Sequence, residues 1–326
     1  MNLTNKEKYR NFCKKEYKLP IFLKDFWLDS VCWNNREVAI FEKGWKIWWV
    51  MPYYQVKKWP LSILTMPKLT QFLWPYIIYP ENQKYYKKIS WEKKVMEDLI
   101  SQLPKFHYFI VNFSSKITNI LPFYWKWFET QIRYTYKIPS NSKLEELEKN
   151  FETDIRRRRK KAEKLGIKVI ESKDIKAFYK LNEKTFKRQW RNIPYSFDFV
   201  KKLFNTLVDS KSVKLYFAQN PEWKKIAWGV FVYDSNDVYY LMGWIDENYK
   251  DLWWMDMVIY EWIKFALNNK KNFDFEWSMV ESIEKYFRSF WSIQVPYYQV
   301  SKNNISLFNP TTKLKIMKFF KDLLKI

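Results

Sequence analysis

Residues Lys225–Val230 read KIAWGV, and residues Lys46–Met51 read KIWWVM about 180 positions earlier in the chain. Each stretch follows two helical segments and a strand-like run, and each is expected to form the second strand of a β-hairpin. With glycine in place of the tryptophans, the two stretches become KIAGGV and KIGGVM. A sequence that recurs at the same point of two successive segments indicates a duplication, so we expect two similarly built lobes.

Outward from these stretches, apolar periodicity and turn residues predict alternating helices and strands. In the first half we expect helices at 4–16, 23–32 and 84–103, and strands at 36–43, 47–57, 61–66, 106–112 and 129–138. In the second half, Ser140–Ser142 caps a basic helix that runs to about Leu165 and ends at Gly166. It is followed by strands at 167–171, 212–218, 225–233, 237–243, 272–276 and 293–300, and by helices at 173–188, 197–209, 253–269, 281–288 and 311–325. This pattern predicts a mixed α/β (α+β) protein of two lobes, residues 1–140 and 141–326, each a mixed twisted sheet flanked by helices.

The chain has 4 glycines and 19 tryptophans in 326 residues, whereas average composition would give about 7% glycine. Several tryptophans stand where a turn favours glycine, including Trp45, Trp223 and Trp254. A lineage that reads UGA as glycine, translated with a table that reads UGA as tryptophan, would produce this pattern. The hypothesis covers Trp33, Trp45, Trp48, Trp49, Trp59, Trp74, Trp127, Trp190, Trp223, Trp228, Trp244, Trp253, Trp254, Trp277 and Trp291.

Two tryptophans, Trp27 and Trp125, fit their surroundings and are interpreted as genuine, whereas Trp91 and Trp262 are left open. The alternative is a truly tryptophan-rich protein that binds carbohydrate or a membrane interface. Under the glycine hypothesis, the tryptophans at turns, chiefly Trp45, Trp223 and Trp254, are expected to be exposed or strained.

The formal net charge of +23 at pH 7 indicates a nucleic acid, an anionic membrane surface or a phosphorylated substrate as partner. A chain rich in Lys, Asn, Ile, Tyr and Phe also fits an AT-rich genome without any functional reason. Cys13, Cys32 and the single histidine, His107, lack the spacing of a zinc site, so no metal is expected. No apolar run reaches 18 residues and the N-terminus lacks a signal-peptide pattern, so we expect a cytoplasmic protein with at most peripheral membrane contact.

Several motifs of the second half resemble the FemAB-like branch of the GNAT acyltransferase superfamily. They are the basic stretch Asp154–Lys164 (DIRRRRKKAEK), Thr185–Trp190 (TFKRQW) with Pro194–Ser196 (PYS), Tyr239–Trp244 (YYLMGW), Phe273–Met279 (FDFEWSM) and Tyr286–Trp291 (YFRSFW). Their order, their spacing and the tryptophans at family glycines all agree over residues 145–300. The first half is similar to the N-terminal lobe of the same proteins through Phe26–Asp29, Leu64–Pro67 and Leu121–Trp125.

The resemblance implies tandem GNAT-like lobes and an N-acetyltransferase or aminoacyltransferase that acylates an amine. Relatives that build peptidoglycan bridges use aminoacyl-tRNA and a nucleotide- or lipid-linked muropeptide, which implies a role in cell-wall or envelope precursor modification. The usual GNAT pyrophosphate turn is Gln/Arg-x-x-Gly-x-Gly/Ala, and the corresponding stretch here, Asn248–Met255, departs from it even with two glycines restored. The donor therefore stays open between an acyl-CoA and aminoacyl-tRNA.

These motifs and their chemistry lead to three sets of candidate site residues. The catalytic candidates are Glu276 as general base, with Asp274 a weaker candidate, and Arg288 as a donor to phosphate or carbonyl. The expected substrate-binding residues are Arg156, Arg157, Lys160, Lys161, Arg188, Gln189 and Tyr240. The expected donor-binding residues are Gly243, Trp244, Lys250, Trp253 and Trp254.

Each of these interpretations has a plainer alternative. The basic helix can be a solvated face, Arg288 can pair with Glu284 one helical turn earlier, and Glu276 can serve as a helix cap. A different class of function, a non-catalytic binder of nucleic acid or anionic surfaces, uses the same charge and aromatic residues.

Overall fold

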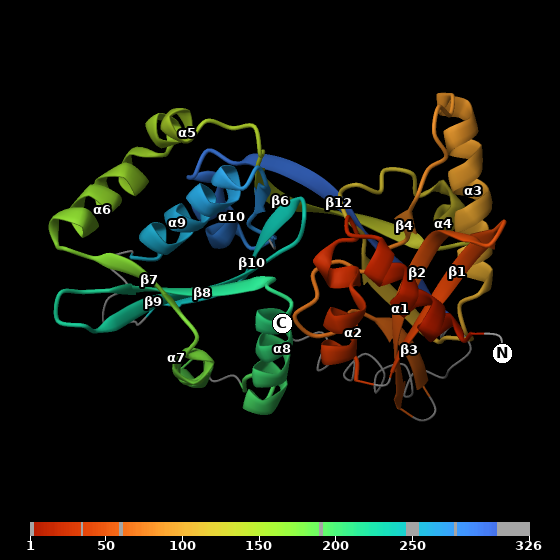
Figure 1. Ribbon diagram of the computed structural model, residues 1–326, viewed down its shortest axis with the longest axis horizontal. Helices are drawn as coiled ribbons and strands as arrows, with labels where there is room; N and C mark the ends of the chain where they lie inside the picture. The colour runs from red at the N-terminus through yellow and green to blue at the C-terminus, as the bar shows by residue number, and fades with distance from the viewer. Residues whose placement is uncertain are drawn as a thin grey trace. The chain divides into compact units, whose positions relative to one another are not determined.

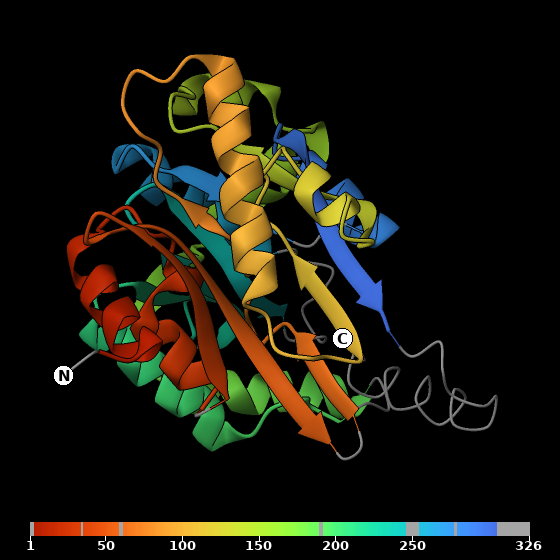
Figure 2. The ribbon, with the colours of Figure 1, turned by 90° about the vertical axis from the view of Figure 1, so that its right-hand side faces the viewer.

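The computed structural model describes residues 3–33, 35–58, 61–188, 192–245, 254–276 and 279–304 (Figures 1 and 2). Internal contacts divide these residues into two compact units. Unit 1 comes from residues 3–12, 32–132 and 297–304, and unit 2 from residues 13–31 and 133–296. The two lobes expected from the sequence met at residue 140, and that boundary stays a prediction. The contacts place the segment 13–31, from the first half of the chain, in unit 2.

The sheet of unit 1 has the strand order β1-β2-β3-β5-β12. The strands are β1 (Arg36–Lys43), β2 (Lys46–Lys58), β3 (Leu61–Thr65), β5 (Tyr108–Asn112) and the end of β12 (Ile293–Asn303), and the two-residue strand β4 (Tyr76–Ile77) pairs with β2. Only the β3–β5 pair is parallel among these described pairings. Helices α1 (Asn5–Lys15), α3 (Tyr85–Ser101) and α4 (Leu121–Tyr124) complete the unit, and α3 packs on β1 and β2 (Figure 2).

The sheet of unit 2 has the order β6-β11-β10-β9-β8-β7, in which β10–β11 is the parallel pair. Its strands are β6 (Glu129–Ile138), β7 (Lys168–Ser172), β8 (Val213–Gln219), β9 (Lys225–Tyr233), β10 (Asp237–Ile245) and β11 (Asn272–Asp274). Its helices are η1 (Ile21–Leu23), α2 (Asp25–Val31), α5 (Leu144–Asn150), α6 (Thr153–Lys164), α7 (Ile175–Arg188), α8 (Phe197–Asp209), α9 (Met255–Asn268) and α10 (Glu281–Arg288).

The strands of the two units repeat one topology, which confirms the duplication inferred from the two echoed stretches. Three consecutive antiparallel strands (β1-β2-β3 and β8-β9-β10) lead through a helix (α3 and α9) to a strand parallel to the third (β5 and β11). Lys46 begins β2 and Lys225 begins β9, so the echoed stretches occupy equivalent strands. Each sheet continues with an antiparallel strand from the other half of the chain, β12 beside β5 and β6 beside β11.

The core of unit 2 forms between α9 and the strands that it covers (Figure 1). Nine residues of α9 are buried, and the ring of Trp262 stacks on Phe231 of β9 with centroids 4.1 Å apart. Close packing at this face uses glycine, because a Cβ at Gly229 would lie 2.4 Å from the ring of Phe231. An apolar helix over an antiparallel meander is therefore what holds unit 2 together.

Several element boundaries differ from the sequence predictions. The expected long basic helix is broken into α5 and α6, because Phe151 takes an extended backbone (φ −57°, ψ 146°) and buries its ring against Phe290 and Tyr260. The predicted end of that helix at Gly166 is confirmed: Gly166 has φ +69°, and the Ile167 amide donates to the carbonyl of Ala162 at 3.1 Å. The helix expected at 311–325 lies outside the described residues.

Five tryptophans occupy the left-handed backbone region that favours glycine. They are Trp33, Trp45, Trp127, Trp223 and Trp291, with φ between 54° and 65°, and they make up half of the ten described non-glycine residues with positive φ. All five are exposed, Trp45 fully so. A left-handed backbone costs an L-residue about 1–2 kcal/mol, and an exposed indole gains little from burial in return.

At Trp45 and Trp127 the type of turn shows why the backbone has a positive φ. Gly44 and Trp45, both with φ of 61°, form the two-residue loop between the paired Lys43 and Lys46, and a loop with two positive φ values is a type I′ hairpin. Trp127 follows α4, where the amide of Phe128 donates to the carbonyl of Phe123 at 3.1 Å in a helix-ending motif that favours glycine. The prediction that Trp45 and Trp223 are strained and exposed is confirmed.

The same prediction was wrong for Trp254. Its φ is −67°, and its side chain is 4% exposed because it packs into the core of unit 2 at the start of α9. The other described candidates of the glycine hypothesis, Trp48, Trp49, Trp74, Trp228 and Trp244, do not have positive φ either.

We expect Trp127→Gly to stabilise the protein by about 1 kcal/mol, because it removes the strain of the left-handed backbone. The greater conformational entropy that glycine gives the unfolded chain offsets part of this gain. Trp125→Gly is the matched control, since Trp125 is also exposed but lies two residues earlier with φ −65° and with Lys93 stacked on its ring at 4.7 Å. That control should destabilise the protein by about 1 kcal/mol. Urea unfolding measures both, and equal effects at the two positions would contradict the strain argument.

Candidate active site

Three charged or polar side chains meet in the interior of unit 2, where β11 ends. Asp274, the last residue of β11, lies opposite Lys137 of β6 in the antiparallel register. The Asp274 Oδ2 atom is 2.8 Å from the ammonium of Lys137, and its Oδ1 accepts a hydrogen bond from the Thr135 hydroxyl at 2.6 Å. Asp274 and Thr135 are fully buried, so the charge of Asp274 is compensated inside the protein and away from solvent.

Glu276, the predicted general base, follows two residues later in an unusual state. Its side chain is 1% exposed, its φ is +56°, and its amide donates to Oδ1 of Asp274 at 2.9 Å. Burial and the neighbouring Asp274 raise the pKa of Glu276 well above its ordinary value, whereas Lys137 acts in the opposite direction. A buried carboxyl held on a strained backbone is typical of functional sites.

A second buried polar network lies at the start of α9 and was not predicted from the sequence. Asp256 accepts from the Nε atom of Arg158 at 2.7 Å and from the Tyr286 hydroxyl at 2.7 Å. Burial raises the pKa of Asp256, although Arg158 and Tyr286 act to lower it. The sequence signal was the acidic residue in the first turn of a helix, and it pointed to no partner because Arg158 lies 98 residues away.

The basic helix α6 divides into an inner and an outer side. Arg158 points inward to Asp256, and the guanidinium of Arg159 stacks on the ring of Tyr260 at 3.2 Å. Four of the seven residues predicted to bind substrate lie on this helix and are exposed on its outer side: Arg156, Arg157, Lys160 and Lys161. Two of them have local partners, since Arg156 donates to Thr153 and Arg157 to Asp154, both at 3.1 Å. The structure thus gathers these four as one exposed flank, and their role in binding stays a prediction.

Arg288, the second catalytic candidate, forms the surface pair that was its plainer interpretation. Its Nε atom donates to Glu284 at 3.0 Å on the same helix, and its side chain is half exposed. Glu284 also accepts from the hydroxyl of Tyr136, which in turn accepts from Gln294 at 2.9 Å. A part for Arg288 in catalysis stays a prediction, and it would need the guanidinium to leave Glu284 or to bind a second group beside it.

Strand β10, which carries the predicted donor-binding residues Gly243 and Trp244, has an irregular register. Tyr240 pairs with Phe231 of β9 but Met242 pairs with Val230, so Leu241 is an extra residue that forms a bulge. Just beyond it, a Cβ at Gly243 would lie 1.7 Å from the hydroxyl oxygen of Tyr240. Glycine at this position therefore lets the tyrosine hydroxyl reach the strand backbone. Burial raises the pKa of Tyr240, so its phenol stays protonated.

The remaining predicted residues are partly beyond what the structure describes. Trp244 is half-buried beside Phe186, with ring centroids 5.5 Å apart, and Trp254 is buried at the start of α9. Arg188 ends α7, although its side chain is not described. Gln189, Lys250 and Trp253 lie outside the described residues.

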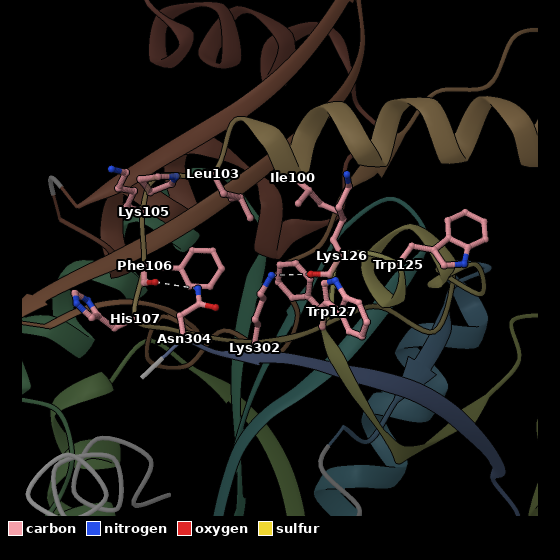
Figure 3. A pocket seen from close by; sticks show the side chains of 12 residues that line it. Ile100, Leu103, Lys105, Phe106, His107, Trp125, Lys126, Trp127, Lys302 and Asn304 are labelled. Atoms are coloured by element: carbon pink, nitrogen blue, oxygen red, sulfur yellow. Dashed lines mark hydrogen bonds between the residues drawn. The ribbon is translucent and has the colours of Figure 1, made fainter. Parts of the chain in front are cut away.

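Unit 1 has a separate open pocket of about 750 Å³, which sequence reasoning did not predict (Figure 3). It is lined by the aromatic residues Phe106, Trp127 and Phe128 and by Lys105, Lys126 and Lys302, among other residues. The Lys302 ammonium donates to the carbonyl of Lys126 at 2.7 Å and lies 5.0 Å from the ring of Phe128. Cations beside aromatic faces suit a flat anionic ligand.

Two features are absent from the described residues. No group of three or more His, Cys, Asp or Glu side chains in them could hold a metal ion. None of their helices is long and apolar enough to cross a membrane.

This chain matches one known domain family and is similar in fold to several solved structures. Residues 149–278 match the model of a family described as "Acetyltransferase (GNAT) domain". No curated protein matches the sequence. Among solved structures, the chain is similar to FemX, with a TM-score of 0.64 and 12% identity over 91% of this chain and 96% of that one.

Two further solved structures show the same fold over nearly the whole chain. L-PGS from Bacillus licheniformis has a TM-score of 0.55 and 10% identity over 98% of both chains. The C-terminal domain of a putative lysylphosphatidylglycerol synthetase from Agrobacterium fabrum has a TM-score of 0.53 and 9% identity, covering 98% of this chain and 97% of that one. The expected fold of tandem GNAT-like lobes is therefore confirmed, and the chain has a GNAT-type acyltransferase fold.

The raised pKa of Glu276 predicts a pH-dependent stability. The folded protein keeps this proton to higher pH than the unfolded chain, whose ordinary pKa is 4.5. The contribution of Glu276 to the free energy of unfolding is therefore full below about pH 4.5 and falls as the pH rises through the raised pKa. Glu276→Gln should remove this fall, so the variant gains stability over the wild type as the pH increases.

Urea unfolding across the pH range measures this difference. Glu222→Gln, at an exposed turn position, is the matched control and should run parallel to the wild type. A Glu276→Gln variant that also runs parallel to the wild type would show that Glu276 is not held protonated by the fold.

Proposed function

We propose that this chain is an acyltransferase that moves an acyl or aminoacyl group from an activated donor to an amine. The observation that carries the proposal is the buried carboxyl of Glu276, on a strained backbone at the end of β11, in a chain with a GNAT-type fold. Such a site supplies a fixed proton acceptor beside the sheet on which GNAT-type proteins bind their donor. The proposed reaction class is therefore N-acetyl or aminoacyl transfer.

The reaction needs few groups from the protein. The amine nitrogen forms a bond to the acyl carbon, the bond from that carbon to the donor sulfur or oxygen breaks, and the amine loses a proton. We assign this proton to Glu276, because a carboxyl with a raised pKa is a stronger proton acceptor once ionised. The carbonyl of the acyl group would lie against β10 near Gly243, where the bulge leaves the backbone accessible to a close approach.

We propose either an acyl-CoA or aminoacyl-tRNA as donor and an anionic acceptor such as a phosphate-linked muropeptide. Support for the aminoacyl alternative comes from the similarity in fold to FemX and to a putative lysylphosphatidylglycerol synthetase. Support for an anionic partner comes from the exposed flank of α6, where Arg156, Arg157, Lys160 and Lys161 lie together without buried partners. We therefore propose a cytoplasmic role in modifying cell-wall or envelope precursors.

A non-catalytic binder of nucleic acid or anionic surfaces is the second candidate. The pocket of unit 1 favours it, because three lysines and several aromatic residues line it (Figure 3). The two candidates differ in their dependence on Glu276, which lies in unit 2 and not in that pocket.

Turnover should depend on Glu276. Purified protein incubated with acetyl-CoA or lysyl-tRNA and an amine acceptor should form an amide product, and Glu276→Gln should lower kcat about 10²–10⁴-fold with little change in KM. The Glu222→Gln variant serves as the control. Product formation that is unaffected by Glu276→Gln would remove Glu276 as the base, and unchanged ligand binding without any product would favour the binder.

Ligand binding should depend on the exposed flank of α6. Arg157→Ala combined with Lys161→Ala should weaken binding of a nucleotide-linked muropeptide, coenzyme A or tRNA by about tenfold or more, because each lost phosphate contact is a charge-assisted hydrogen bond of about 1.5–3 kcal/mol. Folding should not change, since both side chains are exposed.

Lys180→Ala combined with Lys184→Ala is the matched control, because these lysines are also exposed and one turn apart, on α7. Isothermal titration calorimetry measures all three proteins. Tight binding that ignores both α6 substitutions would leave this flank as a solvated face.

We also propose that the five left-handed tryptophans are glycines in the native protein, through UGA codons read as glycine. The support is conformational: Trp33, Trp45, Trp127, Trp223 and Trp291 all have positive φ and are all exposed. Trp27, interpreted as genuine, is instead buried in α2 beside Phe22. A chance distribution would not place the largest side chain at the turns that tolerate a Cβ least.

Mass spectrometry of the protein from its native source tests this proposal. Each glycine makes the chain, of 40.6 kDa as written, about 129 Da lighter. Peptides covering Trp127 should show glycine, whereas those covering Trp125 should show tryptophan. Tryptophan at all five turn positions would overturn the proposal.

A further inference from the structure

We propose that Asp274 and Lys137 are positioning residues for Glu276. Asp274 holds the turn that carries Glu276, and Lys137 pairs with Asp274 across β6 and β11. The significance of this pair for catalysis rests on the proposed function, whereas the pair's action on Glu276 does not. Neither residue needs to touch a substrate for this role.

The two carboxyl oxygens of Asp274 have different partners. Oδ2 faces the ammonium of Lys137 at 2.8 Å across the β6–β11 pair, so it is used for charge compensation. Oδ1 accepts from the Thr135 hydroxyl at 2.6 Å and from the Glu276 amide at 2.9 Å. The second of these bonds ties the first residues after β11 back onto the strand, and it is made while Glu276 has φ of +56°.

This geometry explains how a strained turn persists after so short a strand. β11 has three residues, and its antiparallel register with β6 consists of Phe273 with Ile138 and Asp274 with Lys137. The Phe275 amide adds one hydrogen bond to the carbonyl of Tyr136 at 2.9 Å. The bond from the Glu276 amide to Asp274 then holds the first residues of the left-handed turn.

A purely structural role would not require charge here. A buried ion pair is seldom more stable than apolar side chains of the same shape, because both charges lose their hydration. A sheet pairing between β6 and β11 could therefore use two apolar residues, as it does at Phe273 and Ile138. The two charges lie beside Glu276, the buried glutamate to which the proposed reaction transfers a proton.

Asp274 and Lys137 also shift the pKa of Glu276 in opposite directions. Burial and the charge of Asp274 raise the pKa of Glu276, and Lys137 lowers it. The other groups in this cluster are Thr135 on β6, Tyr239 and Asp237 on β10, and Asp234 in the turn between β9 and β10. The phenol of Tyr239 stays protonated because burial and these carboxylates raise its pKa well above the ordinary value.

The test is a titration of Glu276 that needs no substrate. Protein labelled with ¹³C at glutamate carboxyl groups is titrated by NMR, and the signal that disappears in Glu276→Gln identifies Glu276. Asp274→Asn should move the midpoint of this signal to lower pH by about one unit or more, and Lys137→Met should move it to higher pH by a similar amount.

Two further variants keep the test decisive. Lys137→Arg preserves the charge and should restore the wild-type midpoint. The double variant Lys137→Met with Asp274→Asn leaves no unpaired buried charge, so it should fold even if a single variant does not. Its Glu276 midpoint should return toward that of the wild type. Midpoints that coincide in all variants would overturn the proposal, as would shifts of the same sign for Asp274→Asn and Lys137→Met.

The titration separates this inference from the proposed function. If the Glu276 midpoint shifts in opposite directions in the two single variants but no assay yields an amide product, the inference about Asp274 and Lys137 stands and the acyltransferase proposal is refuted. With active protein, the acid limb of the kcat/KM profile should follow the same two shifts. Active protein in which neither variant moves the midpoint or the acid limb would retain the function and refute the pair.

Discussion

The buried ion pair between Lys137 and Asp274 is the interaction on which the candidate active site of unit 2 depends. It joins β6 to β11, where the strand register is only two residue pairs long, and it turns a carboxylate toward the amide of Glu276. Removing one partner of such a pair costs about 3–5 kcal/mol, because the remaining charge stays buried. This cost is a large part of the total stability of a domain, which is about 5–15 kcal/mol. The pairing of β6 with β11 and the position of Glu276 therefore depend on the same contact.

A second constraint is the backbone at tight turns. The hairpin between β1 and β2 closes in two residues, and such a loop requires positive φ at both Gly44 and Trp45. With five tryptophans in this region at about 1–2 kcal/mol each, the strain approaches the stability of a whole domain. The glycine hypothesis removes this conflict between local conformation and global fold, and natural sequences rarely contain so many conflicts of one kind.

The candidate site was predictable only in part. Glu276 could be predicted because the FDFE stretch ends a strand with a carboxylate beside a family motif. The flank of α6 could be predicted because residues at i, i+1, i+4 and i+5 share a helix side. Arg158 could not, since helical spacing alone does not say which arginine faces the core. Its partner Asp256 lies 98 residues later, and only the packing of α6 on α9 brings the two together.

The sequence by itself determined the alternation of helices and strands, the repeat marked by Lys46 and Lys225, and the turns that require glycine, because these follow from local periodicity and backbone sterics. The tertiary structure alone decided that each sheet continues with a strand from the other half of the chain and that Lys137 meets Asp274. It also decided that Trp254 is buried and Trp45 is not. Register and burial depend on contacts between residues far apart in the chain, and a single sequence carries no local signal for these.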